Sequence, residues 1–140
     1  MNFSFHGWAV LEADFREPSF GQEEANEAVL GAGITALKQY LDEKYTFPFS
    51  FYNSNGLEIL STSGCSNHFR LPPLELFRLV AKIAPGSHGL LYILDHEDRD
   101  GWDNCYQAWV LKKGALKRTL DPFLSPYITE VWEPEDEVYL

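Results

Sequence analysis

The four residues Asn53-Ser54-Asn55-Gly56 constrain the fold of this chain more than any other segment. Asn and Gly tolerate the positive φ angles that tight turns require. On either side of this turn, residues 47–52 and 57–63 have the aromatic, aliphatic and β-branched content that is typical of strands. Two strands joined by so short a turn pair antiparallel. The sequence therefore predicts a β-hairpin, and with it a largely antiparallel sheet.

Apolar residues at three- and four-residue spacing predict two helices. The first runs from about Glu23 to Lys44. Gly31 and Gly33 each weaken this helix by roughly 1 kcal/mol relative to Ala, but such small residues also let another element approach closely. The second helix begins near Pro73, which suits a first helical turn, and ends at residues 85–86, a Pro-Gly pair. Its apolar face consists of Leu76, Leu79, Val80 and Ile83.

Four further segments have the apolar content or the alternation of strands. They are residues 3–14, 89–94, 105–112 and 115–120, and the continuous apolar run 89–94 is typical of a central strand. The resulting order is strand, helix, two strands, helix and then two or three strands. This order predicts an α+β fold, in which a mostly antiparallel sheet of about five to six strands packs against two helices. We expect residues 1–140 to form one domain.

Composition indicates a soluble protein. An apolar share of 45% supplies enough material for a packed core and excludes a disordered chain. No stretch of ~18 uncharged apolar residues occurs, and the N-terminal residues lack the basic start of a secretory signal. Cys65 and Cys105 are too few for a disulfide framework or a structural zinc site. We therefore expect a cytoplasmic location.

Charge limits the choice of partner. Eleven Lys and Arg residues against twenty-one Asp and Glu residues give a net charge of −10 at pH 7. A surface this negative repels the phosphates of nucleic acids and of anionic membranes, so neither is an expected partner. A basic protein would be attracted instead. The charge also has a simpler explanation, because acidic surfaces keep cytosolic proteins soluble.

Two short motifs resemble enzyme sites but lack the context that the chemistry requires. Residues 31–36 match the dinucleotide-binding pattern of glycines, which must lie at a turn between a strand and a helix. Here they fall inside the predicted helix 23–44. The spacing of Cys65 and His68 permits a thiolate–imidazole pair, but no third orienting group or oxyanion-hole signature accompanies them. Neither motif predicts an enzyme.

The densest acidic segment is residues 95–103. If Gly101 is aligned with the invariant glycine of a calcium loop, His96 takes the first ligand position and Gln107 the last, where a bidentate Glu is required. The match thus fails at both ends. Three alternatives remain: a looser calcium or magnesium site, a solvated loop, or a protein-binding loop. In the third case Trp102 is an aromatic anchor amid charges that attract a basic partner.

Four further segments form an ordered set along the chain. They are His-Gly-Trp at residues 6–8, Asn-His-Phe-Arg at 67–70, Pro-Gly-Ser-His-Gly-Leu-Leu-Tyr at 85–92, and Asp-Pro-Phe-Leu-Ser-Pro at 121–126. In this order they resemble the immunity protein 7 family of bacterial polymorphic toxin systems. By this resemblance Trp8 matches the family's characteristic tryptophan, and Asp95 or Asp121 its aspartate. The residues of these segments to which we assign a structural role are Trp8, Asn67, His68, Tyr92, Asp121 and Pro122.

The resemblance implies an α+β protein without catalytic activity or cofactor, which binds a cognate toxin domain and protects the cell that makes the toxin. Many such toxins are nucleases, whose clefts carry Lys and Arg, and an acidic domain complements such a cleft. The alternative is a small metal-binding or enzymatic domain that uses the carboxylates of residues 95–103. The expected toxin contacts are, first, Asp95, Glu97, Asp98, Asp100, Trp102 and Asp103, and second, Glu133, Glu135 and Asp136.

The C-terminal segment also contains Trp132 and Tyr139, whose rings are costly to leave in water. We therefore expect part of this segment to dock on the domain or on a partner.

Overall fold

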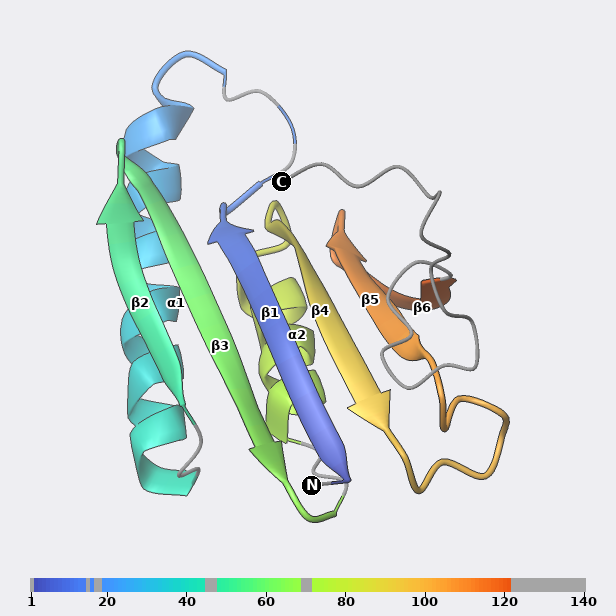
Figure 1. Ribbon diagram of the computed structural model, residues 1–140. Helices are drawn as coiled ribbons and strands as arrows, with labels where there is room; N and C mark the ends of the chain where they lie inside the picture. Colours follow the sequence, from blue (N-terminus) through green and yellow to red (C-terminus); the bar gives the residue numbers. More distant parts are fainter. Residues whose placement is uncertain (1, 15, 17–18, 45–47, 69–71, 122–140) are drawn as a thin grey trace, which may run out of the picture.

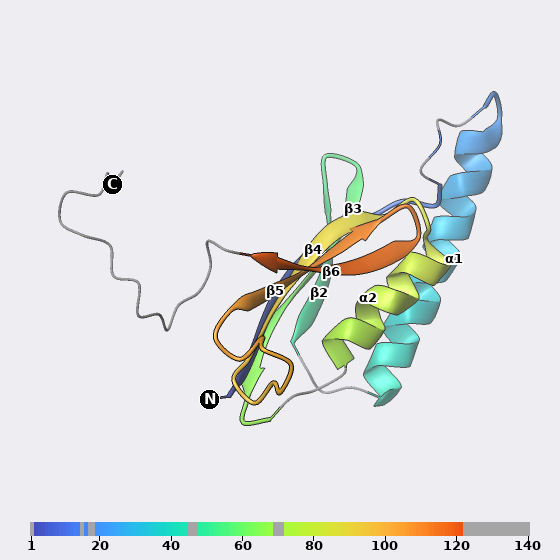
Figure 2. The ribbon, with the colours of Figure 1, turned by 90° about the vertical axis from the view of Figure 1, so that its right-hand side faces the viewer.

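The computed structural model describes residues 2–14, 16, 19–44, 48–68 and 72–121. Its sheet has six strands in the order β2-β3-β1-β4-β5-β6, and every neighbouring pair is antiparallel. Both helices lie on the same side of the sheet (Figure 1; Figure 2). The predicted α+β fold with two helices is therefore confirmed. The elements are β1 (Phe3–Leu11), α1 (Gln22–Lys44), β2 (Phe49–Ser54), β3 (Leu57–Ser66), α2 (Pro72–Ile83), β4 (His88–Asp95), β5 (Tyr106–Lys112) and β6 (Ala115–Asp121).

The predicted hairpin joins β2 to β3. Ser54 pairs with Leu57, so the turn itself is only Asn55 and Gly56, with φ angles of 55° and 79°. Both values lie in the left-handed region that Asn and Gly adopt most easily. The side chain of Asn53 accepts a hydrogen bond from the Gly56 N–H at 3.2 Å, which closes the turn.

Strand β1 lies in the middle of the sheet, between β3 and β4. It ends at Leu11 and not at Asp14 as the sequence predicted. The reason is that both neighbours stop there, since β3 begins at Leu57 and β4 at His88. Beyond this point the Glu12 N–H donates instead to the hydroxyl of Ser87, at 3.1 Å.

Alternate residues of β1 build the core on the helix side of the sheet. Phe3, Phe5, Ala9 and Leu11 are all buried there. They pack with the apolar face of α2 and with part of α1. The buried helical side chains of this core are Leu37, Leu41, Leu74, Leu76, Phe77, Val80 and Ala81.

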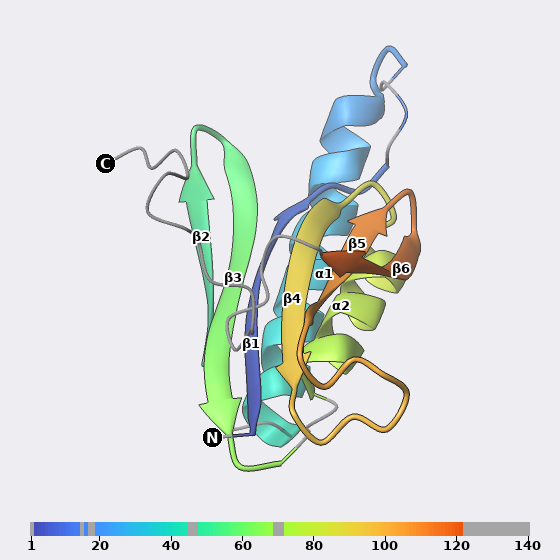
Figure 3. The same cartoon turned by 45° about the vertical axis from the view of Figure 1, so that its right-hand side comes forward.

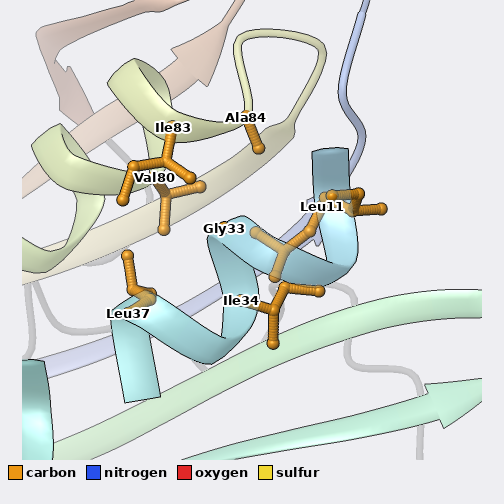
Figure 4. Close-up of a pocket in the computed structure, with 8 residues that line it drawn as sticks. Leu11, Gly33, Ile34, Leu37, Val80, Ile83 and Ala84 are labelled. Atoms are coloured by element: carbon orange, nitrogen blue, oxygen red, sulfur yellow. The ribbon is translucent and has the colours of Figure 1, made fainter. Parts of the chain in front are cut away.

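The two helices approach each other at Gly33 of α1. A Cβ atom at this position would overlap the side chain of Ile83 in α2, whereas a Cβ at Gly31 would meet nothing. Figure 4 shows the crevice beside this contact, which is also lined by Leu11, Ile34 and Val80. The expected close approach thus occurs at one of the two glycines. Residues 31–36 lie within α1, so no strand-to-helix turn exists there to hold a dinucleotide.

Candidate functional site

The acidic segment forms the connection between β4 and β5, at the end of the sheet where β1 begins (Figure 3). Asp95 is the last residue of β4, directly opposite Phe3 on β1, and it is only 7% exposed. Its carboxylate accepts a hydrogen bond from the Glu97 N–H at 3.0 Å, and its carbonyl accepts one from the Asp98 N–H at 3.2 Å. Asp95 thus fixes the direction in which the chain leaves the sheet.

Asp98 organises the next turn of this loop. One of its carboxylate oxygens accepts hydrogen bonds from the N–H groups of Asp100, at 2.8 Å, and Trp102, at 2.9 Å. Gly101 lies between them with a φ of 93°, a conformation that disfavours any residue with a side chain. Because these bonds are internal to the loop, the loop has a defined shape before any partner binds.

Three acidic residues of the loop are exposed, namely Glu97, Asp100 and Asp103. The Asp103 carbonyl accepts a hydrogen bond from Nδ1 of the His96 ring at 2.9 Å, so the backbone of Asp103 is held in place. Within the described part of the chain, no three His, Cys, Asp or Glu residues are grouped so that they could hold a metal ion.

Trp102 is half-buried at the margin of the loop. The guanidinium of Arg118, on β6, stacks over its ring at 4.4 Å from the centroid and lies 5.7 Å from the ring of Trp109 on β5. Such a cation–π contact holds an aromatic side chain in one orientation. Trp102 is thus presented as a fixed apolar surface beside the carboxylates.

The segment that contains Asn67 and His68 meets the acidic loop in space, a contact that the sequence did not predict. The Nδ1 atom of His68 lies 3.2 Å and 3.3 Å from the two carboxylate oxygens of Glu97, and Asn2 donates to Glu97 at 3.1 Å. His68 pairs in this way with Glu97 and not with Cys65. Neighbouring Asn67 is exposed.

The two cysteines differ in their surroundings. Cys65 is exposed on β3, whereas Cys105 is half-buried before β5. Burial, and then the negative charges of Asp103 and Asp98, raise the pKa of the Cys105 thiol. These effects disfavour the Cys105 thiolate, which is the reactive form of the side chain.

Trp8 and Tyr92 lie on the side of the sheet that carries no helix. Both are among the residues to which we assigned a structural role. Strand alternation places Trp8 opposite to the buried Phe5 and Ala9, and it is 42% exposed with its ring edge-on to His88 at 6.4 Å. The ring of Tyr92 packs edge-on against Tyr106 at 6.3 Å. The alternation of β1 was the sequence signal for this placement.

The remaining predicted residues lie at or beyond the end of β6. Asp121 is the last residue of that strand and pairs with Tyr106. The other four, with the tail expected to dock, lie outside the described residues: Pro122, Glu133, Glu135 and Asp136.

A comparison with known protein families identifies the family of this chain. The sequence profile of the family described as Immunity protein 7 matches residues 2–133, which is nearly the whole chain and includes every helix and strand that the structure describes. The chain belongs to the immunity protein 7 family. Comparisons with curated proteins and with solved structures found no match.

Membership of the immunity protein 7 family implies an immunity protein, with a toxin protein as its partner. This family does not indicate an enzyme. Among the described residues of this immunity protein, neither helix is long and apolar enough to cross a membrane.

Proposed function

We propose that this immunity protein neutralises a cognate toxin domain of a bacterial polymorphic toxin system by binding it through the acidic β4–β5 loop. The toxin domain is basic and is a nuclease, and the complex forms in the cytoplasm of the producing cell. The observation that carries this proposal is the preformed loop, in which Asp95 and Asp98 hold the backbone while Glu97, Asp100 and Asp103 are exposed.

Electrostatics favours a basic partner. The chain carries a net charge of −10, and the exposed acids Glu97, Asp100 and Asp103 concentrate negative charge at one end of the sheet. A nuclease active site needs Lys and Arg to hold phosphates, and the same side chains attract carboxylates. Complementary charges of this kind accelerate encounter and exclude partners of the wrong sign.

The shape of the loop favours a long-lived complex. Binding a loop that is already ordered costs less conformational entropy than binding one that must fold on contact. The hydrogen bonds to Asp98 and the stacking of Arg118 on Trp102 supply this order. A fixed Trp beside charged residues has the character of an interface hot spot. In this proposal the tail acids Glu133, Glu135 and Asp136 add a second, peripheral contribution to charge attraction.

Co-expression with the adjacent toxin domain tests the proposal. The wild-type protein is expected to restore growth and to co-purify with the toxin. The double variant Asp100→Asn/Asp103→Asn removes two outward charges without touching Asp95 or Asp98, and it should raise the Kd at least about tenfold. The matched control is Glu23→Gln/Glu24→Gln, which removes two exposed charges at the start of α1.

An equal Kd for the loop variant and the control would overturn the loop as the interface. Absence of both rescue and complex with the wild-type protein would overturn the immunity function for that toxin. Thermal stabilisation by calcium or magnesium, measured on the protein alone, would favour the metal-binding alternative, because a ligand that binds the folded state raises its Tm.

A further inference from the structure

Two tryptophan rings hold the guanidinium of Arg118 on the edge strand β6. Arg118 pairs in register with Trp109 on β5, so both side chains lie on the helix side of the sheet, where Trp109 packs against the core. Trp102, from the β4–β5 loop, is the second ring. The guanidinium carbon lies 4.4 Å from the ring centroid of Trp102 and 5.7 Å from that of Trp109. These cation–π contacts restrict where the positive charge of Arg118 lies.

Both rings have anchors other than Arg118. The backbone N–H of Trp102 donates a hydrogen bond to the Asp98 carboxylate at 2.9 Å, and the indole N–H of Trp109 donates one to Gln107 at 3.1 Å. Gln107 is itself only 3% exposed. The two rings therefore form a preformed surface for the guanidinium, built from the acidic loop and from β5.

The N–H donors of this guanidinium are not used within the described part of the chain. Arg118 is exposed, and its contacts to described residues are the two ring contacts, with no hydrogen bond or ion pair. A guanidinium carries five N–H donors in a planar fork, which matches a carboxylate bidentately. Because the rings already restrict the long side chain, a bound group loses less affinity to the ordering of that side chain. Arg118 is thus available to donate two parallel hydrogen bonds to an acidic group on another molecule.

The charges around Arg118 select the source of that acidic group. Asp98, Asp100 and Asp103 lie in the same loop as Trp102, and the chain carries a net charge of −10, so the surrounding field repels a free phosphate or a nucleic acid. A carboxylate on a protein differs, because Lys and Arg residues beside it can pair with the loop acids at the same time. The group that fits Arg118 is therefore an Asp or Glu side chain within a basic protein surface.

We propose that Arg118 is a specificity-determining residue of the toxin interface, which donates two hydrogen bonds to one Asp or Glu of the toxin domain. This inference rests on the proposed function and adds to it, because positive charge on the toxin does not by itself satisfy Arg118. A toxin with Lys or Arg at the corresponding position brings two positive groups together, and such like-charge contacts reject a partner. Arg118 thus distinguishes the cognate toxin from other basic domains that the acidic loop attracts.

The first test measures the Kd of the complex with the adjacent toxin domain. Arg118→Ala should raise the Kd at least about tenfold, because it removes one partner of a hydrogen-bonded charge pair. The matched control is Lys117→Ala, which removes the same charge from the neighbouring exposed residue, whose side chain lies on the other face of β6. The control should not raise the Kd, since loss of a lysine does not repel a basic toxin. Equal Kd values for the two variants would overturn the proposal.

Arg118→Lys separates this contact from a role in holding Trp102. The lysine keeps a positive charge beside the two rings but has no planar pair of donors, so the Kd should still rise about fivefold. Near-ultraviolet circular dichroism of the free variants shows whether the packing of the tryptophan rings is preserved. Wild-type affinity of Arg118→Lys would overturn the proposal, because a positive charge without the planar fork would then suffice.

A double-mutant cycle identifies the acidic partner. Each exposed Asp and Glu of the toxin is changed to Ala in turn, and each variant is measured against the wild-type immunity protein and against Arg118→Ala. For one of these acids, the two changes together should raise the Kd no more than about either change alone, because both remove the same contact. If every pair of effects multiplies, the inference is wrong while the immunity function stands. Absence of any complex with the wild-type protein overturns the proposed function for that toxin, and this inference with it.

Discussion

Gly33 of α1 and Ile83 of α2 touch so closely that no Cβ atom fits at position 33. We predict that Gly33→Ala destabilises the protein by about 1–3 kcal/mol, because the helices must move apart or Ile83 must leave its rotamer. Gly31→Ala, two residues away in the same helix with open space around it, should instead stabilise the protein by about 0.5–1 kcal/mol. Urea denaturation of the two variants measures both values, and equal shifts of the same sign would contradict the helix contact.

The β4–β5 loop should lose its shape when Asp98 is truncated. Asp98→Ala removes the acceptor of the Asp100 and Trp102 N–H groups, so we expect these two amides to exchange with solvent about tenfold faster. Global stability should fall by no more than about 1–2 kcal/mol, since the loop lies outside the core. Asp100→Ala is the control within the loop, because it removes an exposed carboxylate and keeps the bonds to Asp98. Unchanged exchange in Asp98→Ala would show that the loop is held by other contacts.

The Cys105 thiol offers a reporter of the same loop. Its pKa is raised by burial and by Asp103 and Asp98, whose negative charges disfavour the thiolate. Asp103→Asn removes one of these charges, so the pKa should fall and the thiolate fraction at a fixed pH below the pKa should rise. We expect alkylation of Cys105 to be about twice as fast as in the parent, a modest effect because solvent screens the charge.

This measurement uses Cys65→Ser as the parent, so that only Cys105 reacts. The alkylation rate of Cys105 is measured as a function of pH. In Asp103→Asn the curve should shift to lower pH. In Glu23→Gln, which removes a remote charge, the curve should not shift. A shift to higher pH would contradict the electrostatic origin of the raised pKa.

Local patterns in the sequence were sufficient to predict the helices, the β2–β3 hairpin and the fold class. Each depends on residues close in sequence, such as the turn at Asn55-Gly56 or the apolar spacing of α2. The end of β1 was mispredicted because strand length is set by partners, here Leu57 and His88, that are distant in sequence.

In the candidate site, too, features that depend on local sequence were predictable, whereas contacts between distant residues were not. The acidic composition of residues 95–103 is visible in the sequence, but the burial of Asp95 and the contact between His68 and Glu97 are not. The latter joins positions 29 residues apart, and only the order β3-β1-β4 brings them to the same end of the sheet. The alternation of β1 places Trp8 on the face opposite to Phe5 and Ala9. It predicts that Trp8 is exposed only once both helices are known to cover the face of Phe5 and Ala9.

Charge reversal at two separate places distinguishes a local interface at the β4–β5 loop from the effect of net charge. Asp100→Lys/Asp103→Lys should lower the association rate with the toxin about tenfold at low salt and flatten its salt dependence. Glu23→Lys/Glu24→Lys makes the same change of net charge at the start of α1, and it should lower the rate far less. Stopped-flow mixing over a range of salt concentrations measures all three proteins. If the two variants slowed association equally, net charge alone would guide the encounter and the loop would not be the place where the toxin binds.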